Sequence, residues 1–203
     1  NEAMTIKSPA EVELLRRANT VSEQAYAAIR AEMKAGVTEM HLAGVAFEVA
    51  MGSGAENLSF PMALVGGPRG GLKHVLPTDY VLREGDMVFM DFGLVFDGYV
   101  TDNAKTAVVG RGSQEIVHYV RTADEMTKAS VAAIRPGIAQ SLIDDVAFEV
   151  ACEAGLSEDY YFRAHGVGTT LFQFPRFFPG DGTTLRIVEV TGTESEIDTF
   201  VSL

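Results

Sequence analysis

The chain has 203 residues, 47% hydrophobic and 22% charged, which excludes a disordered or fibrous protein. Its formal net charge of −12 argues against nucleic-acid binding, because phosphate backbones are bound by clustered cations. No apolar run reaches the roughly 18 residues of a membrane-spanning helix, so we expect a soluble chain. Its single cysteine, Cys152, cannot form an internal disulfide, and the first residues lack the apolar segment of a secretory signal. These features favour a cytoplasmic protein.

Two helices are predicted first along the chain. Ser8-Pro9-Ala10-Glu11 is typical of a helix start, with a capping hydroxyl, a proline at the first helical position and a glutamate three residues after the cap. Apolar residues then recur at helical spacing. The elements expected in this part are a helix that ends at Gly36, a helix from Thr38 to about Met51, a strand over 60–67 and a glycine-rich loop over 68–73.

A β-hairpin is predicted in the middle of the chain. Asp97-Gly98 is a dipeptide typical of a two-residue hairpin turn. The expected strands run from Met87 to Val95 and from Val100 to Val109. Two further helices are expected near 114–134 and 140–154.

The sequence contains an internal repeat. The hexamer at Val45–Ala50 recurs letter for letter at Val146–Ala151, and Ala27–Arg30 recurs at Ala132–Arg135. Both matches can also arise because such letters are common in amphipathic helices. A true repeat predicts two similar halves, packed as a pseudo-twofold α+β unit with sheets inside and helices outside. A site between the halves would take its residues from both.

Two aspartates lie on the predicted hairpin. With a two-residue turn, facing positions have numbers that sum to 195, so Asp102 faces Gly93, two positions from Asp91 on the same face. Asp91 and Asp102 are then diagonal neighbours, about 7–8 Å apart at Cα. The apolar strand around Asp91 is expected to be buried on both faces, where an aspartate is costly unless it is paired, hydrogen-bonded or bound to a metal. The alternative is that Asp91 and Asp102 lie on an exposed face of the hairpin, where water solvates both carboxylates.

Four histidines are present, and two of them have neighbours that suggest function. His165 lies beside glycines that allow close approach of backbone or ligand, and His74 ends the glycine-rich loop. His41 and His118 lie in helical stretches, where surface or core roles are expected. Two aspartates and one histidine suit manganese, iron, cobalt or zinc. If His165 shares a metal with them, its ring should lie within about 5 Å of the carboxylates.

Several motifs together resemble one known family. They are Gly85–Gly93 with Asp91, Asp97-Gly98-Tyr99, Thr101-Asp102, Lys105-Thr106 and His165-Gly166-Val167-Gly168. Over nearly the whole chain they look like the catalytic domain of the pita-bread metallohydrolases, which include methionine aminopeptidase, prolidase, aminopeptidase P and creatinase. The prolidase–creatinase branch is the most similar.

This resemblance implies a fold, a cofactor and site residues. The fold is α+β, with a pseudo-twofold repeat of helices outside a curved antiparallel sheet. Asp91, Asp102 and His165 would be ligands of two divalent metal ions, and His74 would be a catalytic histidine on the substrate side. The implied function is hydrolysis of an amide or related C–N bond in a peptide or small amide, by default an Xaa-Pro dipeptide, by a homodimer.

Two departures from the family pattern stand out. Phe172 occupies the position of a second histidine in prolidase-type peptidases, which makes it a candidate substrate-binding residue and favours a creatinase-like amidohydrolase as the alternative. The family's two glutamate ligands are absent. The stretch that ends at Arg186 resembles the family just before them, and the stretch that begins at Ile187 resembles the family just after them, so a segment of roughly 20–30 residues is expected to be missing here. We expect one catalytic domain over residues 1–203, interrupted between 186 and 187 and without the N-terminal domain of prolidase-like relatives. A genuine deletion would instead favour a metal-free binding module.

Overall fold

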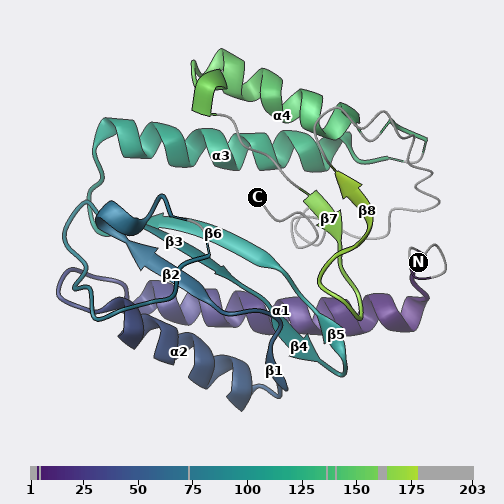
Figure 1. Cartoon of the computed structure of the whole chain (residues 1–203), viewed down its shortest axis with the longest axis horizontal. Helices are drawn as coiled ribbons and strands as arrows, with labels where there is room; N and C mark the ends of the chain where they lie inside the picture. Colours follow the sequence, from purple (N-terminus) through teal and green to yellow (C-terminus); the bar gives the residue numbers. More distant parts are fainter. Residues whose placement is uncertain are drawn as a thin grey trace.

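The computed structural model describes residues 4, 6–72, 74–135, 137–139, 141–159 and 164–177 (Figure 1). It begins with helix α1 (Pro9–Glu32), which is capped by Ser8 and Glu11 in the predicted reciprocal arrangement. Helix α2 (Glu39–Gly52) follows, with the Thr38 hydroxyl accepting from the His41 N–H group. Helix α1 was expected to end at Gly36 but ends four residues earlier, at Glu32. Gly36 has a positive φ and lies in the loop between α1 and α2.

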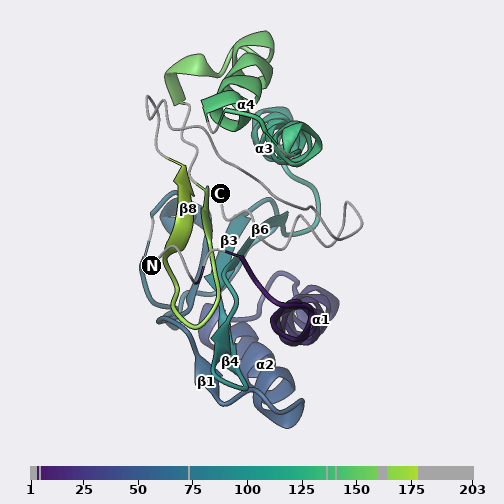
Figure 2. The same cartoon turned by 90° about the vertical axis from the view of Figure 1, so that its right-hand side faces the viewer.

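Two three-stranded antiparallel sheets form the first half. One has the order β2 (Ala63–Gly66), β3 (Met87–Phe92) and β6 (Asn103–Val108). The other has the order β1 (Asn57–Leu58), β4 (Leu94–Phe96) and β5 (Tyr99–Val100). Figure 2 shows α1 and α2 on one side of β3 and β6, with β8 on the other side.

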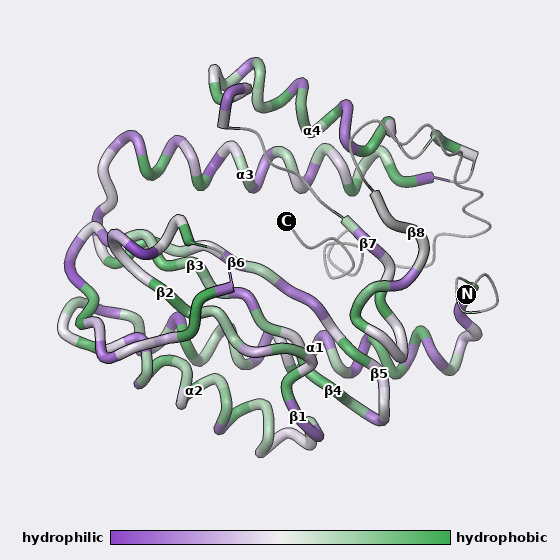
Figure 3. Tube along the Cα trace, viewed as in Figure 1, coloured by the Kyte–Doolittle hydropathy of each residue, from purple (hydrophilic) through white to green (hydrophobic). Residues whose placement is uncertain are grey.

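The main core lies between these helices and the sheets. Leu42 of α2 and Ile29 of α1 pack with Phe92 of β3, and all three are fully buried. Hydrophobic residues follow β2, β3 and β4 (Figure 3). The prediction that β3 is buried on both faces was wrong: its residues alternate, and Asp91 lies on the half-buried face. Asp91 therefore lies on the side of β3 opposite the helices.

The second half repeats the helix pair. Helix α3 (Gln114–Ala133) packs against α4 (Ser141–Glu153), and strand β7 (Ala164–Gly166) pairs with β8 (Gln173–Phe177). The repeated hexamer lies on α2 and α4, and its six residues have the same order of buried, half-buried and exposed positions in both helices. This agreement supports the repeat. Two short 3₁₀ helices, η2 (Gly67–Arg69) and η3 (Ser157–Asp159), complete the described elements.

The hairpin has the predicted register but more breaks than expected. Asp91 pairs with Ala104 and Phe96 with Tyr99, so the facing numbers sum to 195, and Asp97 and Gly98 both have positive φ as the turn requires. The long strands are interrupted at Gly93 and at 101–102, and the strand predicted over 60–67 is confined to β2.

None of the described helices is both long enough and apolar enough to span a membrane. The predicted interruption between Arg186 and Ile187 lies outside the described residues.

Candidate active site

The two halves of the chain meet at an aspartate and a histidine. Asp102 precedes β6, and its Oδ2 lies 3.0 Å from Nε2 of His165 on β7. Both side chains are buried, with residue exposures of 6% and 9%. The expected approach of His165 to within about 5 Å of this carboxylate is confirmed by the distance. We call these two residues the Asp102–His165 pair.

The β7 end of the second half is held against the hairpin by backbone and side-chain contacts. The Val100 N–H group donates to the Gly168 carbonyl at 2.7 Å. A small apolar cluster joins Leu15 of α1, Val100 of β5 and Val167, which follows β7. These contacts lie two or three residues from the members of the Asp102–His165 pair, so they bring the two side chains together.

The histidine ring presents Nε2 to the carboxylate because its other nitrogen has a separate partner. Nδ1 of His165 lies 3.1 Å from the Gly166 carbonyl, which can only accept a hydrogen bond. A proton on Nδ1 leaves a lone pair on Nε2, facing the carboxylate of Asp102. Two facing lone pairs need a proton or a cation between them.

Asp91 adds a second carboxylate whose burial is not compensated. Its Oδ1 is buried and has no hydrogen-bond partner among the described residues. Burial and, to a smaller extent, the nearby charge of Asp102 raise the pKa of Asp91 to about 7, while His165 acts in the opposite direction. A buried carboxylate oxygen without a hydrogen-bond partner is costly unless a proton or a bound cation neutralises it.

These residues fit part of a metal-binding set. Two carboxylates and an imidazole are suitable donors for a first-row divalent ion. However, no group of three or more histidine, cysteine or acidic side chains is arranged to hold a metal within the described ranges. The resemblance places the family's two glutamate ligands in the segment expected to be missing between Arg186 and Ile187, which lies outside the described residues.

The other two candidate residues lie differently. Phe172 packs its ring against that of His165, with centroids 4.4 Å apart and a tilt of 50°. His74 is exposed on the loop between η2 and β3 and has a left-handed φ of 56°. Among the described residues, no hydrogen bond or ion pair joins His74 to Asp91, Asp102 or His165. Of the surface and core roles expected for His41 and His118, the structure shows the surface one: both are exposed, beside Glu32 and the Ala154 carbonyl.

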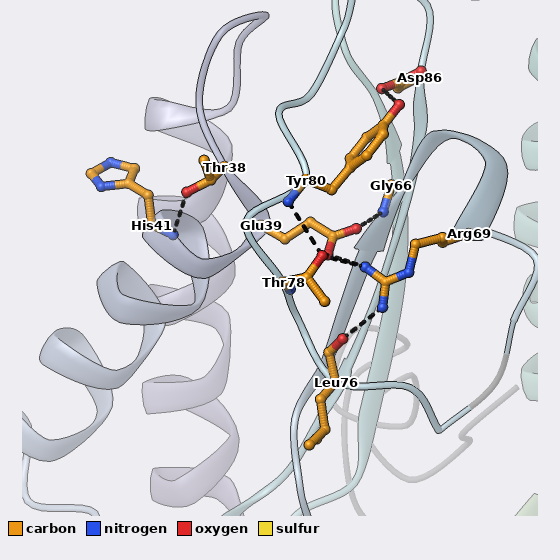
Figure 4. A network of polar contacts seen from close by, with 9 residues as sticks. All are labelled: Thr38, Glu39, His41, Gly66, Arg69, Leu76, Thr78, Tyr80 and Asp86. Atoms are coloured by element: carbon orange, nitrogen blue, oxygen red, sulfur yellow. Dashed lines mark hydrogen bonds and ion pairs between the residues drawn. The ribbon is translucent and has the colours of Figure 1, made fainter.

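Sequence reasoning missed a buried glutamate at the start of α2. Glu39 is fully buried, and its Oε1 accepts from the Gly66 N–H group at 2.8 Å. Its Oε2 accepts from the N–H group and the hydroxyl of Thr78, at 2.8 and 2.9 Å, and forms an ion pair with Arg69 (Figure 4). Nη2 of Arg69 also donates to the Leu76 carbonyl at 2.8 Å. One carboxylate thus ties together both arms of the loop that carries His74.

Replacing Glu39 by glutamine should destabilise the fold by about 2–4 kcal/mol, because an amide NH₂ would face donors that now converge on an acceptor. Urea unfolding measures this change. The matched control is Glu32→Gln, which removes an exposed carboxylate paired with His41 and should cost less than about 1 kcal/mol. Equal losses in the two variants would contradict a special role for the Glu39 contacts.

Comparison with known proteins places this arrangement in a family. Residues 13–197 match metallopeptidase family M24. An Xaa-Pro dipeptidase from Pyrococcus furiosus is 29% identical over 183 residues, which are 89% of this chain and 52% of the relative. A methionine aminopeptidase from Helicobacter pylori is 30% identical over 171 residues, 82% of this chain and 68% of the relative.

Solved structures share the fold. The prolidase from Pyrococcus furiosus matches with a TM-score of 0.85 and 28% identity, over 91% of this chain and 55% of that one. Dipeptidase PepE from Mycobacterium ulcerans matches with a TM-score of 0.84 and 27% identity, over 91% and 50%. The chain spans about half the length of these dipeptidases. It has their α+β pita-bread fold, and with the match over residues 13–197 this establishes that the chain belongs to metallopeptidase family M24.

Proposed function

We propose that this chain is the catalytic part of a metal-dependent hydrolase that cleaves Xaa-Pro dipeptides. The observation that carries the proposal is the meeting of Asp102 with His165 beside the unpaired oxygen of Asp91, in a chain of a metallopeptidase family. The relatives named Xaa-Pro dipeptidase and prolidase support this substrate class.

In this proposal Asp91, Asp102 and His165 are metal ligands. Bound divalent metal would polarise the scissile carbonyl and lower the pKa of a bound water molecule. We propose two ions, of manganese, cobalt, iron or zinc, because oxygen and imidazole donors suit these metals. Asp91 lies on the half-buried face of β3, on the side away from α1 and α2, and a substrate would approach from that side.

Two further residues would act on the substrate. His74, on its exposed loop, would donate an N–H group to the oxygen of the scissile carbonyl as negative charge develops there. Phe172 would form an apolar wall of the substrate pocket beside His165, since its ring lies against the histidine and the residue is 54% exposed. For the whole protein we propose a cytoplasmic homodimer. The cytoplasm is a reducing compartment, and this location is supported by Cys152, the single cysteine, which is exposed and has a free thiol.

A creatinase-like small-molecule amidohydrolase is the second candidate. The observation that favours it is Phe172, because a phenylalanine cannot supply the proton or hydrogen bond that a histidine at this place would give.

We expect the whole protein, supplied with Mn²⁺, to hydrolyse Xaa-Pro dipeptides faster than creatine-like or ectoine-like amides. The measurement is product release across both substrate groups, with an EDTA-treated sample as control. Turnover of the second group alone would reject the dipeptidase and favour the alternative. If the purified protein binds no metal and hydrolyses neither group, it is a binding module instead.

A further inference from the structure

The hairpin is interrupted immediately before Asp102. β5 ends at Val100 and β6 begins at Asn103, so Thr101 and Asp102 lie between two strands. The Thr101 N–H group donates to the Leu94 carbonyl at 2.9 Å, as in a regular antiparallel pair. The return bond differs, because the Leu94 N–H group donates to the Thr101 hydroxyl, also at 2.9 Å. A side-chain oxygen therefore replaces the backbone carbonyl in the ladder.

The carbonyl that leaves the ladder has a defined place. The carbonyl oxygen of Thr101 accepts a hydrogen bond from the Ser59 hydroxyl at 2.9 Å. It also lies against Gly93, where an added Cβ atom would be only 1.8 Å away. The peptide that joins Thr101 to Asp102 is therefore turned out of the sheet, and a glycine at 93 is needed to accommodate it.

The hydroxyl of Thr101 also contacts helix α1. It lies 3.1 Å from the Ser22 hydroxyl, which in turn is 3.3 Å from the Ala18 carbonyl. Since the Thr101 oxygen accepts from Leu94, its own hydrogen can be donated to Ser22, and Ser22 can donate to Ala18. Thr101 and Ser22 are fully buried. The turned peptide is thus fixed by a chain of hydrogen bonds between the hairpin and a rigid helix.

We propose that Thr101 is a positioning residue, whose hydroxyl replaces its carbonyl in the ladder and so directs Asp102 out of the sheet to His165. The consequence for metal binding rests on the proposed function, but the contact between Asp102 and His165 does not. In a regular ladder the Leu94 N–H group would donate to the Thr101 carbonyl. The peptide between Thr101 and Asp102 would then be rotated, and the Asp102 side chain with it.

The test compares Thr101→Val with Thr101→Ser in the full chain. Valine has the shape of threonine without the hydroxyl, whereas serine keeps the hydroxyl. We expect Thr101→Val to lower Mn²⁺ affinity by about 10- to 100-fold, and Thr101→Ser to restore it to within about threefold of the unmodified chain. Calorimetric titration with Mn²⁺ alone measures both. Thr106→Val, on an exposed position of the same hairpin, is the matched control and should leave the affinity unchanged.

A second readout needs neither metal nor activity. In EDTA, the ring resonances of His165 in an NMR spectrum report its contact with Asp102. We expect them to shift in Thr101→Val and to return in Thr101→Ser, while those of His118 stay in place. Should Thr101→Val fail to fold, Ser22→Ala removes the next member of the hydrogen-bond chain and should shift the same resonances by a smaller amount.

The outcomes separate the two proposals. An unshifted His165 and unchanged Mn²⁺ affinity in folded Thr101→Val would overturn the positioning role, as would a Thr101→Ser variant as impaired as Thr101→Val. If the unmodified chain binds no Mn²⁺ but its His165 resonances still depend on the Thr101 hydroxyl, the positioning role stands and the proposed function fails.

Discussion

Replacing Asp102 by asparagine is expected to reduce the proposed Xaa-Pro hydrolysis by at least about 10³-fold in kcat/KM, with a loss of Mn²⁺ affinity. The carboxylate faces the Nε2 atom of His165 at 3.0 Å, and a neutral amide can neither balance the charge of a cation there nor supply a second anionic oxygen. The fold should persist, because asparagine has the same shape and Thr101 keeps its contacts. Steady-state kinetics at saturating Mn²⁺ and calorimetric titration measure the two losses.

The matched control is Asp97→Asn in the turn of the same hairpin. Asp97 has a φ of 48°, which asparagine tolerates, and its contact with Arg17 is long, at 3.9 Å. We expect its kcat/KM to stay within about twofold of the unmodified chain, since exposed ion pairs contribute little. If Asp102→Asn behaves like this control, Asp102 does not belong to the active site.

The register of the hairpin could be predicted because a short local signal determines it. Asp97-Gly98 adopts two positive φ values, which allows a two-residue turn, and the turn then fixes which residues face one another. The pairing of Asp91 with Ala104 follows from this signal alone. The start of α1 was equally predictable, since Ser8 and Glu11 form the reciprocal cap that their spacing indicates.

The breaks in the hairpin could not be predicted, because they depend on contacts with distant segments. The Thr101 carbonyl leaves the ladder because Ser59, before β2, provides a partner for it, while Ser22 of α1 provides one for the Thr101 hydroxyl. Glu39 was missed for the same reason. An acidic residue in the first turn of a helix is typical of an exposed surface, and only the fold places Arg69 and Thr78 around it.

The proximity of Asp102 and His165 was predictable from the sequence, but the contacts that produce it were not. Glycines singled out His165, and the hairpin register placed Asp102 beside Asp91; the structure brings Asp102 and His165 together. Their contact depends on the backbone bond between Val100 and Gly168 and on the packing of Leu15, which no local pattern encodes. The roles assigned to all five candidate residues stay predictions: Asp91, Asp102, His165, His74 and Phe172.

Asp91→Asn is expected to stabilise the metal-free chain, although it should abolish metal binding. The Oδ1 atom of Asp91 is buried without a hydrogen-bond partner, and the Asp102 carboxylate lies near enough to repel it. A neutral amide removes this repulsion and lowers the desolvation cost. At pH 8 in EDTA we expect a gain of about 1–3 kcal/mol in the free energy of unfolding, measured in urea, whereas Asp97→Asn should give almost none.

The dependence of this gain on pH and metal distinguishes it from a general stabilisation. The pKa of Asp91 is raised from its ordinary 3.8 to about 7, so the folded chain binds this proton more tightly than the unfolded chain does. The unmodified metal-free chain should therefore gain stability as the pH falls from about 7 towards 4, and the advantage of Asp91→Asn should shrink over the same range. Adding Mn²⁺ at about 100 times its dissociation constant should stabilise the unmodified chain by about 2.7 kcal/mol and leave the variant unchanged. An Asp91→Asn variant that is less stable than the unmodified chain in EDTA at pH 8 would show that the carboxylate stabilises the fold rather than serving a cation.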